Sequence, residues 1–251
     1  FTPARRYSFL VGKNENSHSA QSRLLPVLLN DEVNPTLEEL EEIFSVERVT
    51  KEFFEKYRAL FLRLKESPDA FIKKDAKVRE DFKSKGVDTV NFAKKLLGQI
   101  VFLYFLQKKG WFGVKRGEEW GSGSKHFLRE LFEKYKGDTG IPACDSLSNS
   151  TNKNVCATMG KNFFNDILEP LFYEALRLER PGDYYSRFNC RIPFLNGGLF
   201  DPINDYDWWK TDILLPDDIF SNDRKTKEGD TGDGILDIFD RYNFTVKEDE
   251  P

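Results

Sequence analysis

Cysteine and histidine are scarce in this sequence. The three cysteines, Cys144, Cys156 and Cys190, are odd in number and lie far apart in a chain of 251 residues, which is too long to depend on disulfide staples. Only two histidines are present, His18 and His126, and neither lies beside a pair of cysteines. The sequence therefore predicts a reduced, cytoplasmic protein without a zinc-type metal site.

Long apolar runs are also missing. Residues 100–106 are apolar without interruption, but this run is far shorter than the ~20 residues that span a bilayer, and lysines flank it on both sides. The first residues contain no apolar segment of the kind found in signal peptides. We therefore expect no membrane partner.

An excess of positive charge is absent as well. The chain has 38 Lys and Arg against 42 Asp and Glu, which gives a net charge of −4 and a pI near 5.5. A typical nucleic-acid-binding domain is basic overall. Any contact with a polyanion must therefore be made by a local basic surface.

Motifs for methyl transfer are missing too. Transfer from S-adenosylmethionine to an adenine amine needs a glycine-rich turn after a strand and an Asn/Asp-Pro-Pro-aromatic tetrapeptide. Residues 34–36 come nearest to the tetrapeptide but lack the second proline and the ring, and the glycines of residues 121–123 follow no strand. A phosphate-binding loop and a Ser or Cys nucleophile with a His partner are likewise absent.

A magnesium-dependent nuclease is one alternative. Pro68-Asp69 together with Asp81 and Lys83 matches the letters of a motif that places two carboxylates and a lysine on adjacent strands. The sequence between them has the charged, periodic texture of a helix. The nuclease is therefore our second alternative function.

Aromatic residues are abundant, with 23 phenylalanines, and they recur in nearly every apolar stripe. The strongest stripe lies within residues 92–111, where apolar side chains at helical spacing surround the run 100–106. Asp88 can accept from the first free N–H groups, and Gly110 can take the left-handed position after the last turn. We expect a central core helix buried on all sides.

Further apolar patterns predict a mainly α fold, an irregular helical bundle with a few short strands and long loops. A capping box at Thr36 and Glu39 starts one helix, and Pro170 kinks or restarts another. A β-prone run predicts a strand at residues 7–11. The expected helices are 24–29, 36–44, 46–66, 69–85, 125–136, 163–178 and 235–242.

Changes in texture along the chain suggest three parts. Residues 1–34 form a lead-in, residues 35–189 a helical domain with a flexible loop at 138–160, and residues 190–251 a turn-rich subregion. The chain starts without methionine and ends at Pro251 with no clear boundary. We expect it to be a fragment of a longer protein, cut before a methyltransferase domain.

Six lysines are candidates for contact with DNA phosphates, although solvated helix faces are the more common role of such clusters. The pairs at the two ends of the central helix lie ~20 Å apart at helical rise, so they cannot form one patch. The glycines of residues 196–198 favour a tight turn with positive φ over a phosphate cradle. The candidate lysines are Lys73, Lys74, Lys94, Lys95, Lys108 and Lys109.

Several stretches together resemble the helical spacer of type IIG restriction-modification enzymes and of large adenine-specific DNA methyltransferases, including BREX-type relatives. The resemblance extends from about Arg5 to Pro251, and the ordered set is more specific than any one stretch. The stretches are residues 35–40, 44–54, 101–111, 167–172, 192–200 and 240–246.

The resemblance implies a non-catalytic connector in a bacterial defence enzyme. In that family the spacer lies between a nuclease domain and a methyltransferase domain of the same polypeptide, and the parent enzyme uses S-adenosylmethionine and Mg²⁺ on DNA. No active-site residue of either domain has a counterpart here, so we expect no cofactor in this fragment. A free-standing helical interaction module is the first alternative.

Overall fold

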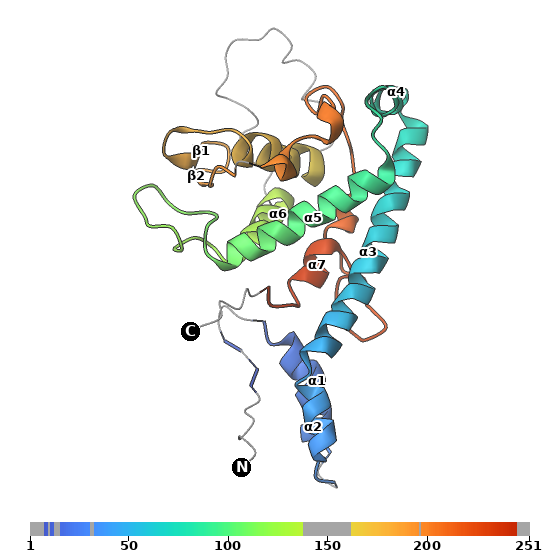
Figure 1. The fold of residues 1–251 in the computed structure, drawn as a ribbon, viewed down its shortest axis with the longest axis vertical. Helices are drawn as coiled ribbons and strands as arrows, with labels where there is room; N and C mark the ends of the chain where they lie inside the picture. Colours follow the sequence, from blue (N-terminus) through green and yellow to red (C-terminus); the bar gives the residue numbers. More distant parts are fainter. Residues whose placement is uncertain are drawn as a thin grey trace.

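The computed structural model describes residues 8–9, 11–12, 16–30, 33–137, 162–195 and 197–244, without the side chains of 46–47 and 68–74. Within these residues the fold is mainly helical, as predicted (Figure 1). None of these helices is both long enough and apolar enough to cross a membrane. The α-helices are α1 (His18–Leu28), α2 (Leu37–Ile43), α3 (Val46–Lys74), α4 (Ala76–Lys85), α5 (Thr89–Lys108), α6 (Phe127–Gly137) and α7 (Ile235–Phe239).

Short elements make up the rest of the described chain. Strands β1 (Tyr184–Tyr185) and β2 (Cys190–Arg191) pair antiparallel, with Tyr184 opposite Arg191. Residues 198–244 are irregular, as predicted, and α7 is shorter than the expected helix 235–242. The 3₁₀ turns are Pro181–Asp183, Gly198–Phe200, Ile203–Asp205 and Asp217–Ile219.

The ends of α5 follow their sequence signals. The Asp88 carboxylate accepts from the Asn91 backbone N–H at 2.8 Å. At the other end Gly110 has φ +68°, and Trp111 N–H donates to the Leu106 carbonyl at 3.2 Å, which is the Schellman pattern. The predicted caps of the central helix are confirmed.

The prediction that α5 is buried on all sides is wrong on one face. Phe102 is 38% exposed, and Val101 and Phe105 are half-buried. The cover on this side comes from irregular chain, because Phe102 meets the Phe200 ring at 6.1 Å and Phe105 meets Phe244 at 5.4 Å. An irregular segment covers the rings less completely than a packed helix does.

One hydrophobic cluster joins α3 to α7 and the irregular segment. Phe239 of α7 belongs to it and contacts Phe53 and Tyr57 of α3 and Tyr104 of α5, with ring centroids 5.2 to 6.3 Å apart. No described residue of α1 or α2 belongs to this cluster, and both helices lie below α7 in Figure 1. The predicted domain boundaries stay a prediction.

The predicted helix boundary before Pro68 is wrong. Helix α3 continues for 29 residues to Lys74, and the break comes at Asp75, whose carboxylate accepts from the N–H groups of Lys77 at 2.8 Å and Val78 at 3.4 Å. A proline removes one helical hydrogen bond, whereas an N-cap carboxylate satisfies two free donors. The N-cap signal therefore decides where α4 begins.

The predicted helix 163–178 is present over residues 163–176, with π-helical turns at Phe164–Leu168 and Leu171–Leu176. Pro170 between them has helical angles of φ −60° and ψ −37°. A proline ring crowds the carbonyl four residues earlier, and the wider π turns relieve this crowding. Pro170 therefore lies inside a continuous helix and does not restart it.

Two predictions fall on or near residues that are not described. The loop 138–160 lies outside the described residues, and so do Tyr7 and Leu10 of the expected strand 7–11. Val11 has no strand assignment. The expected short helix 24–29 is present as α1, but it begins earlier, at His18.

Candidate functional site

The candidate lysines with described side chains lie at the two ends of α5. Lys94 is exposed and Lys95 half-buried near the first turns of α5, and Lys109 is exposed at the other end of this helix. Lys108 is half-buried, with its ammonium 3.5 Å from the Asn243 side-chain oxygen. The side chains of Lys73 and Lys74 lie outside the described residues. The role of these lysines in DNA contact stays a prediction.

Lys95 serves the protein itself. Its ammonium donates to the Gly198 carbonyl at 3.0 Å, and burial lowers its pKa, an effect that Asp201 and Asp205 oppose. One turn later the buried Gln99 amide donates to the Leu199 carbonyl at 2.8 Å. These two contacts fix residues 197–199, the glycine loop, against α5. A buried amide on an apolar helix needs such a partner. In the sequence, Gln99 was therefore the residue that could have indicated a contact between the central helix and another segment.

The glycine loop has a different backbone from the one predicted. Gly197 has φ 173°, which is extended, and Gly198 begins a 3₁₀ turn. Neither glycine has the positive φ of the predicted tight turn. Asn196 lies outside the described residues. Side-chain contacts from α5 hold this loop and make a tight turn unnecessary.

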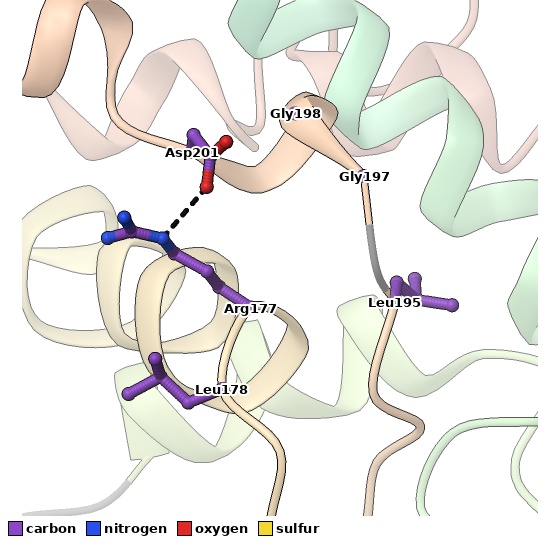
Figure 2. Close-up of a pocket in the computed structure, with 6 residues that line it drawn as sticks. All are labelled: Arg177, Leu178, Leu195, Gly197, Gly198 and Asp201. Carbon is purple, nitrogen blue, oxygen red and sulfur yellow. Dashed lines mark ion pairs between the residues drawn. The ribbon is translucent and has the colours of Figure 1, made fainter.

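An open pocket of about 310 Å³ lies beside this loop (Figure 2). The Arg177 guanidinium points at Asp201, with Nε 2.8 Å from Oδ1, and both side chains are partly exposed. Leu178 and Leu195 line the apolar side. Because the cation is already paired with a carboxylate, the pocket lacks the uncompensated charge that would attract a phosphate.

The described residues of the nuclease motif lie on helices and not on adjacent strands. Asp81 and Lys83 lie on helix α4, and the Asp81 carboxylate accepts from the Thr211 hydroxyl at 2.7 Å. The Asp69 side chain is outside the described residues. Across the part of the chain that the structure describes, no group of three His, Cys, Asp or Glu could hold a metal ion.

A buried carboxyl group, Glu169, was missed by the sequence reasoning. It is 1% exposed, and its Oε1 accepts from the Tyr206 hydroxyl at 2.6 Å, which lies 3.1 Å from the Tyr173 hydroxyl. Burial raises the pKa of Glu169 well above its usual range. The acidic residue within the apolar stretch 167–172 was the available signal.

We expect Glu169→Gln to remove a pH dependence of stability. The folded protein retains a proton that the unfolded chain releases, so the stability from neutral Glu169 is complete below pH ~4.3 and is lost as pH rises toward the folded pKa, by up to about 1.4 kcal/mol per pH unit. Urea unfolding at pH 4 and pH 7 measures this. The variant should gain stability over the wild type only at pH 7.

The exposed Glu179→Gln is the matched control for this change, because it removes a carboxyl group from the surface. It should reproduce the pH profile of the wild type. Parallel profiles for Glu169→Gln and the wild type between pH 4 and pH 7 would contradict the assignment of a neutral, buried Glu169.

The thiol of Cys190 is buried in β2, and burial raises its pKa to about 11. A thiol with a raised pKa is a poor nucleophile at neutral pH, because the thiolate is the reactive form. Cys144 and Cys156 lie outside the described residues. Cys190 is therefore a packing residue.

The loop between α5 and α6 is joined to the β1–β2 hairpin, and the two lie on the same side of the molecule in Figure 1. Arg191 N–H donates to the Val114 carbonyl at 2.7 Å, and its guanidinium donates to the Glu118 carbonyl at 2.8 Å. The same guanidinium lies 4.2 Å from the centroid of the Trp120 ring. The sequence reasoning missed this arrangement, because the contacts join residues about 70 positions apart.

Comparison with known proteins gives one distant match. No protein-family model matches the chain, and no solved structure matches it. A protein of Methanocaldococcus jannaschii described as a "Putative type II restriction enzyme and methyltransferase" is 23% identical over 226 residues, which cover 81% of this chain. The chain is related to a restriction-modification protein.

The match covers only a small part of the relative. The chain spans about 15% of the length of this restriction-modification relative. The predicted relation to restriction-modification proteins is confirmed in this general form. The assignment to the helical spacer stays a prediction.

Proposed function

We propose that the chain is a non-catalytic helical connector of a DNA adenine methyltransferase and restriction enzyme. It positions nuclease and methyltransferase domains of the same polypeptide and contacts the DNA backbone. The observation that carries this proposal is the alignment, in which most of this chain corresponds to a small part of a much longer restriction-modification relative. S-adenosylmethionine and Mg²⁺ would act in the parent enzyme, outside this segment.

A contact between the segment before α1 and the segment after α7 supports this proposal. Asn16 N–H donates to the Asn243 side-chain oxygen at 2.9 Å, and the Asn243 amide donates back to the Asn16 carbonyl at 3.2 Å. Domains attached before Asn16 and after Asn243 would therefore start from the same end of the helical body. A connector of this shape would hold its neighbours close together.

Exposed apolar side chains on α1 and α2 also fit a connector. Leu28, Leu29 and Leu37 are 67 to 73% exposed, and neither helix contributes to the main hydrophobic cluster. Exposed apolar surface of this kind is typical of an interface. A free-standing interaction module would use the same surface, so this surface does not distinguish the two functions. They are distinguished by what the gene encodes next to this segment.

The reading frame that contains this segment tests the proposal. We expect an Asn-Pro-Pro-aromatic motif in frame shortly after Pro251. A stop codon directly after Pro251 would contradict the connector and favour the free-standing module. The frame is read from the DNA that encodes the protein.

Calorimetry on the chain tests its lack of a cofactor site. We expect no heat of binding for S-adenosylmethionine, because the chain has neither the glycine-rich turn nor the tetrapeptide that would bind it. Binding in the micromolar range would contradict this expectation.

Plasmid cleavage with Mg²⁺, with Asp81→Ala as the control, tests the nuclease alternative, and we expect no cleavage by either protein.

A further inference from the structure

The edge formed by residues 109–126 and 180–191 carries a charge opposite to that of the whole chain. These two segments are the α5–α6 connection and the β1–β2 hairpin with its lead-in. They hold seven Lys and Arg against three Asp and Glu, a net charge of +4, whereas the whole chain has −4. A local surface of this sign attracts a polyanion even when the protein is acidic overall.

Several backbone contacts fix the shape of this edge. The N–H groups of Gly121 and Gly123 both donate to the Gly110 carbonyl, at 3.1 and 2.9 Å. The Arg191 guanidinium bridges the two segments, because it donates to the carbonyls of Glu118 at 2.8 Å and Gly182 at 3.1 Å. A surface that is ordered before binding loses less entropy when a ligand arrives.

Arg116 is the cation of this edge that is best placed for a ligand. Its guanidinium carbon lies 3.6 Å from the centroid of the Tyr184 ring, which orients the guanidinium plane. Among the described residues it has no hydrogen-bond acceptor and no ionic partner. Its N–H donors therefore remain available for a planar, bidentate contact, the geometry in which arginine binds phosphate.

Two rings of the edge hold guanidinium groups. One face of Tyr184 holds Arg116 and one face of Trp120 holds Arg191. Proteins that bind single strands stack bases on open aromatic faces. These rings instead position guanidinium groups, which favours contact with the backbone of a duplex.

Building on the proposed function, we infer that this edge binds the phosphate backbone of duplex DNA, with Arg116 as the main contact and Lys115 beside it. Lys115 is 81% exposed, with its ammonium 4.0 Å from the Glu118 carboxylate. A backbone contact is independent of sequence. The two cations named here differ from the lysines predicted from the sequence, of which only Lys109 belongs to this edge, because Lys115 and Arg116 lie on a loop and not on a face of α5.

Fluorescence anisotropy of the 251-residue chain with labelled 20-bp duplexes of unrelated sequence, titrated with salt, tests this inference. Arg116→Gln should weaken binding by about the same factor for every duplex, and it should reduce the slope of log K against log salt by about 1. Lys115→Gln should act in the same direction. Arg116→Lys should restore part of the loss.

The control is Lys94→Gln, which removes a positive charge from an exposed position at the other end of α5 and should leave binding unchanged. Equal losses for Lys94→Gln and Arg116→Gln, or wild-type binding by Arg116→Gln, would overturn the inference. Binding of single-stranded oligonucleotides without duplexes would do the same.

The duplex-binding experiment and the reading-frame test of the connector can fail separately. An in-frame methyltransferase motif combined with no duplex binding by the chain would overturn the DNA-binding edge and leave the connector proposal intact. Duplex binding that is lost in Arg116→Gln, without such a motif in the gene, would support the edge and contradict the connector.

Discussion

Replacing Gly110 by alanine is expected to destabilise the fold by about 2 to 5 kcal/mol, from the cost of a positive φ and of an atom added to a packed site. Gly110 has φ +68°, and a Cβ built on it would lie 2.2 Å from the Gly121 carbonyl oxygen. That oxygen belongs to the backbone, so it cannot move without shifting the loop. Urea unfolding followed by circular dichroism gives the change in free energy.

The same helix provides the matched control. Gly98 lies inside α5, and a Cβ added there would meet no atom within 4 Å outside the backbone of the helix. Gly98→Ala is therefore expected to raise the free energy of unfolding by about 0.5 to 1 kcal/mol, because alanine has the higher helix propensity. Equal effects of the two substitutions would contradict the account of how α5 ends.

Replacing Arg129 by methionine has the second large expected effect. Arg129 of α6 binds two carboxylates, with Nε 2.7 Å from Asp240 and Nη2 2.9 Å from Asp237, and Nη1 donates to the Ser221 hydroxyl at 2.7 Å. The Asp237 side chain is only 8% exposed. Tyr104 of α5 also donates to Asp240, at 2.7 Å, so this cluster joins three helices.

Without the cation, two largely buried carboxylates lose their partner. We expect Arg129→Met to cost about 3 kcal/mol, the lower end of what the removal of one partner from a buried pair costs. Arg48→Met is the control, since Arg48 pairs with Glu42 at 2.6 Å but both side chains are about 60% exposed. It should cost less than about 1 kcal/mol. Similar losses for the two variants would show that burial does not determine the strength of the Arg129 cluster.

The predictions that rest on short local signals agree best with the structure. The capping box at the start of α2 is present, with Glu39 N–H donating to the Thr36 hydroxyl at 3.2 Å and Thr36 N–H donating to the Glu39 carboxylate at 2.8 Å. The Asp88 cap and the left-handed Gly110 are present too. Each of these features depends on residues within one turn, so the pattern of residues specifies them directly.

Features that depend on the tertiary structure were not predictable in this way. The Arg129 cluster joins residues more than 100 positions apart, and the Arg116–Tyr184 contact joins residues 68 positions apart. Phe102 belongs to the most apolar stretch of the chain and is nevertheless 38% exposed. Periodicity shows which side chains are apolar, but only the fold determines what covers them.

The candidate site changed most between sequence and structure. Lysine clusters stand out in a sequence because they are contiguous, yet Lys95 donates to a backbone carbonyl. Arg116 stands out only when its contact with Tyr184 is seen. The sequence therefore shows which residues are cationic. The structure shows which of these cations already have a partner within the protein and which can still bind DNA.

Methylation of duplex DNA tests the central claim most directly. The polypeptide encoded by the complete reading frame and the 251-residue chain are each incubated with DNA and S-adenosylmethionine, and N6-methyladenine is measured by mass spectrometry. The connector account predicts methylation by the complete polypeptide and none by this chain. Methylation by the chain alone, or its absence with the complete polypeptide, would contradict the account.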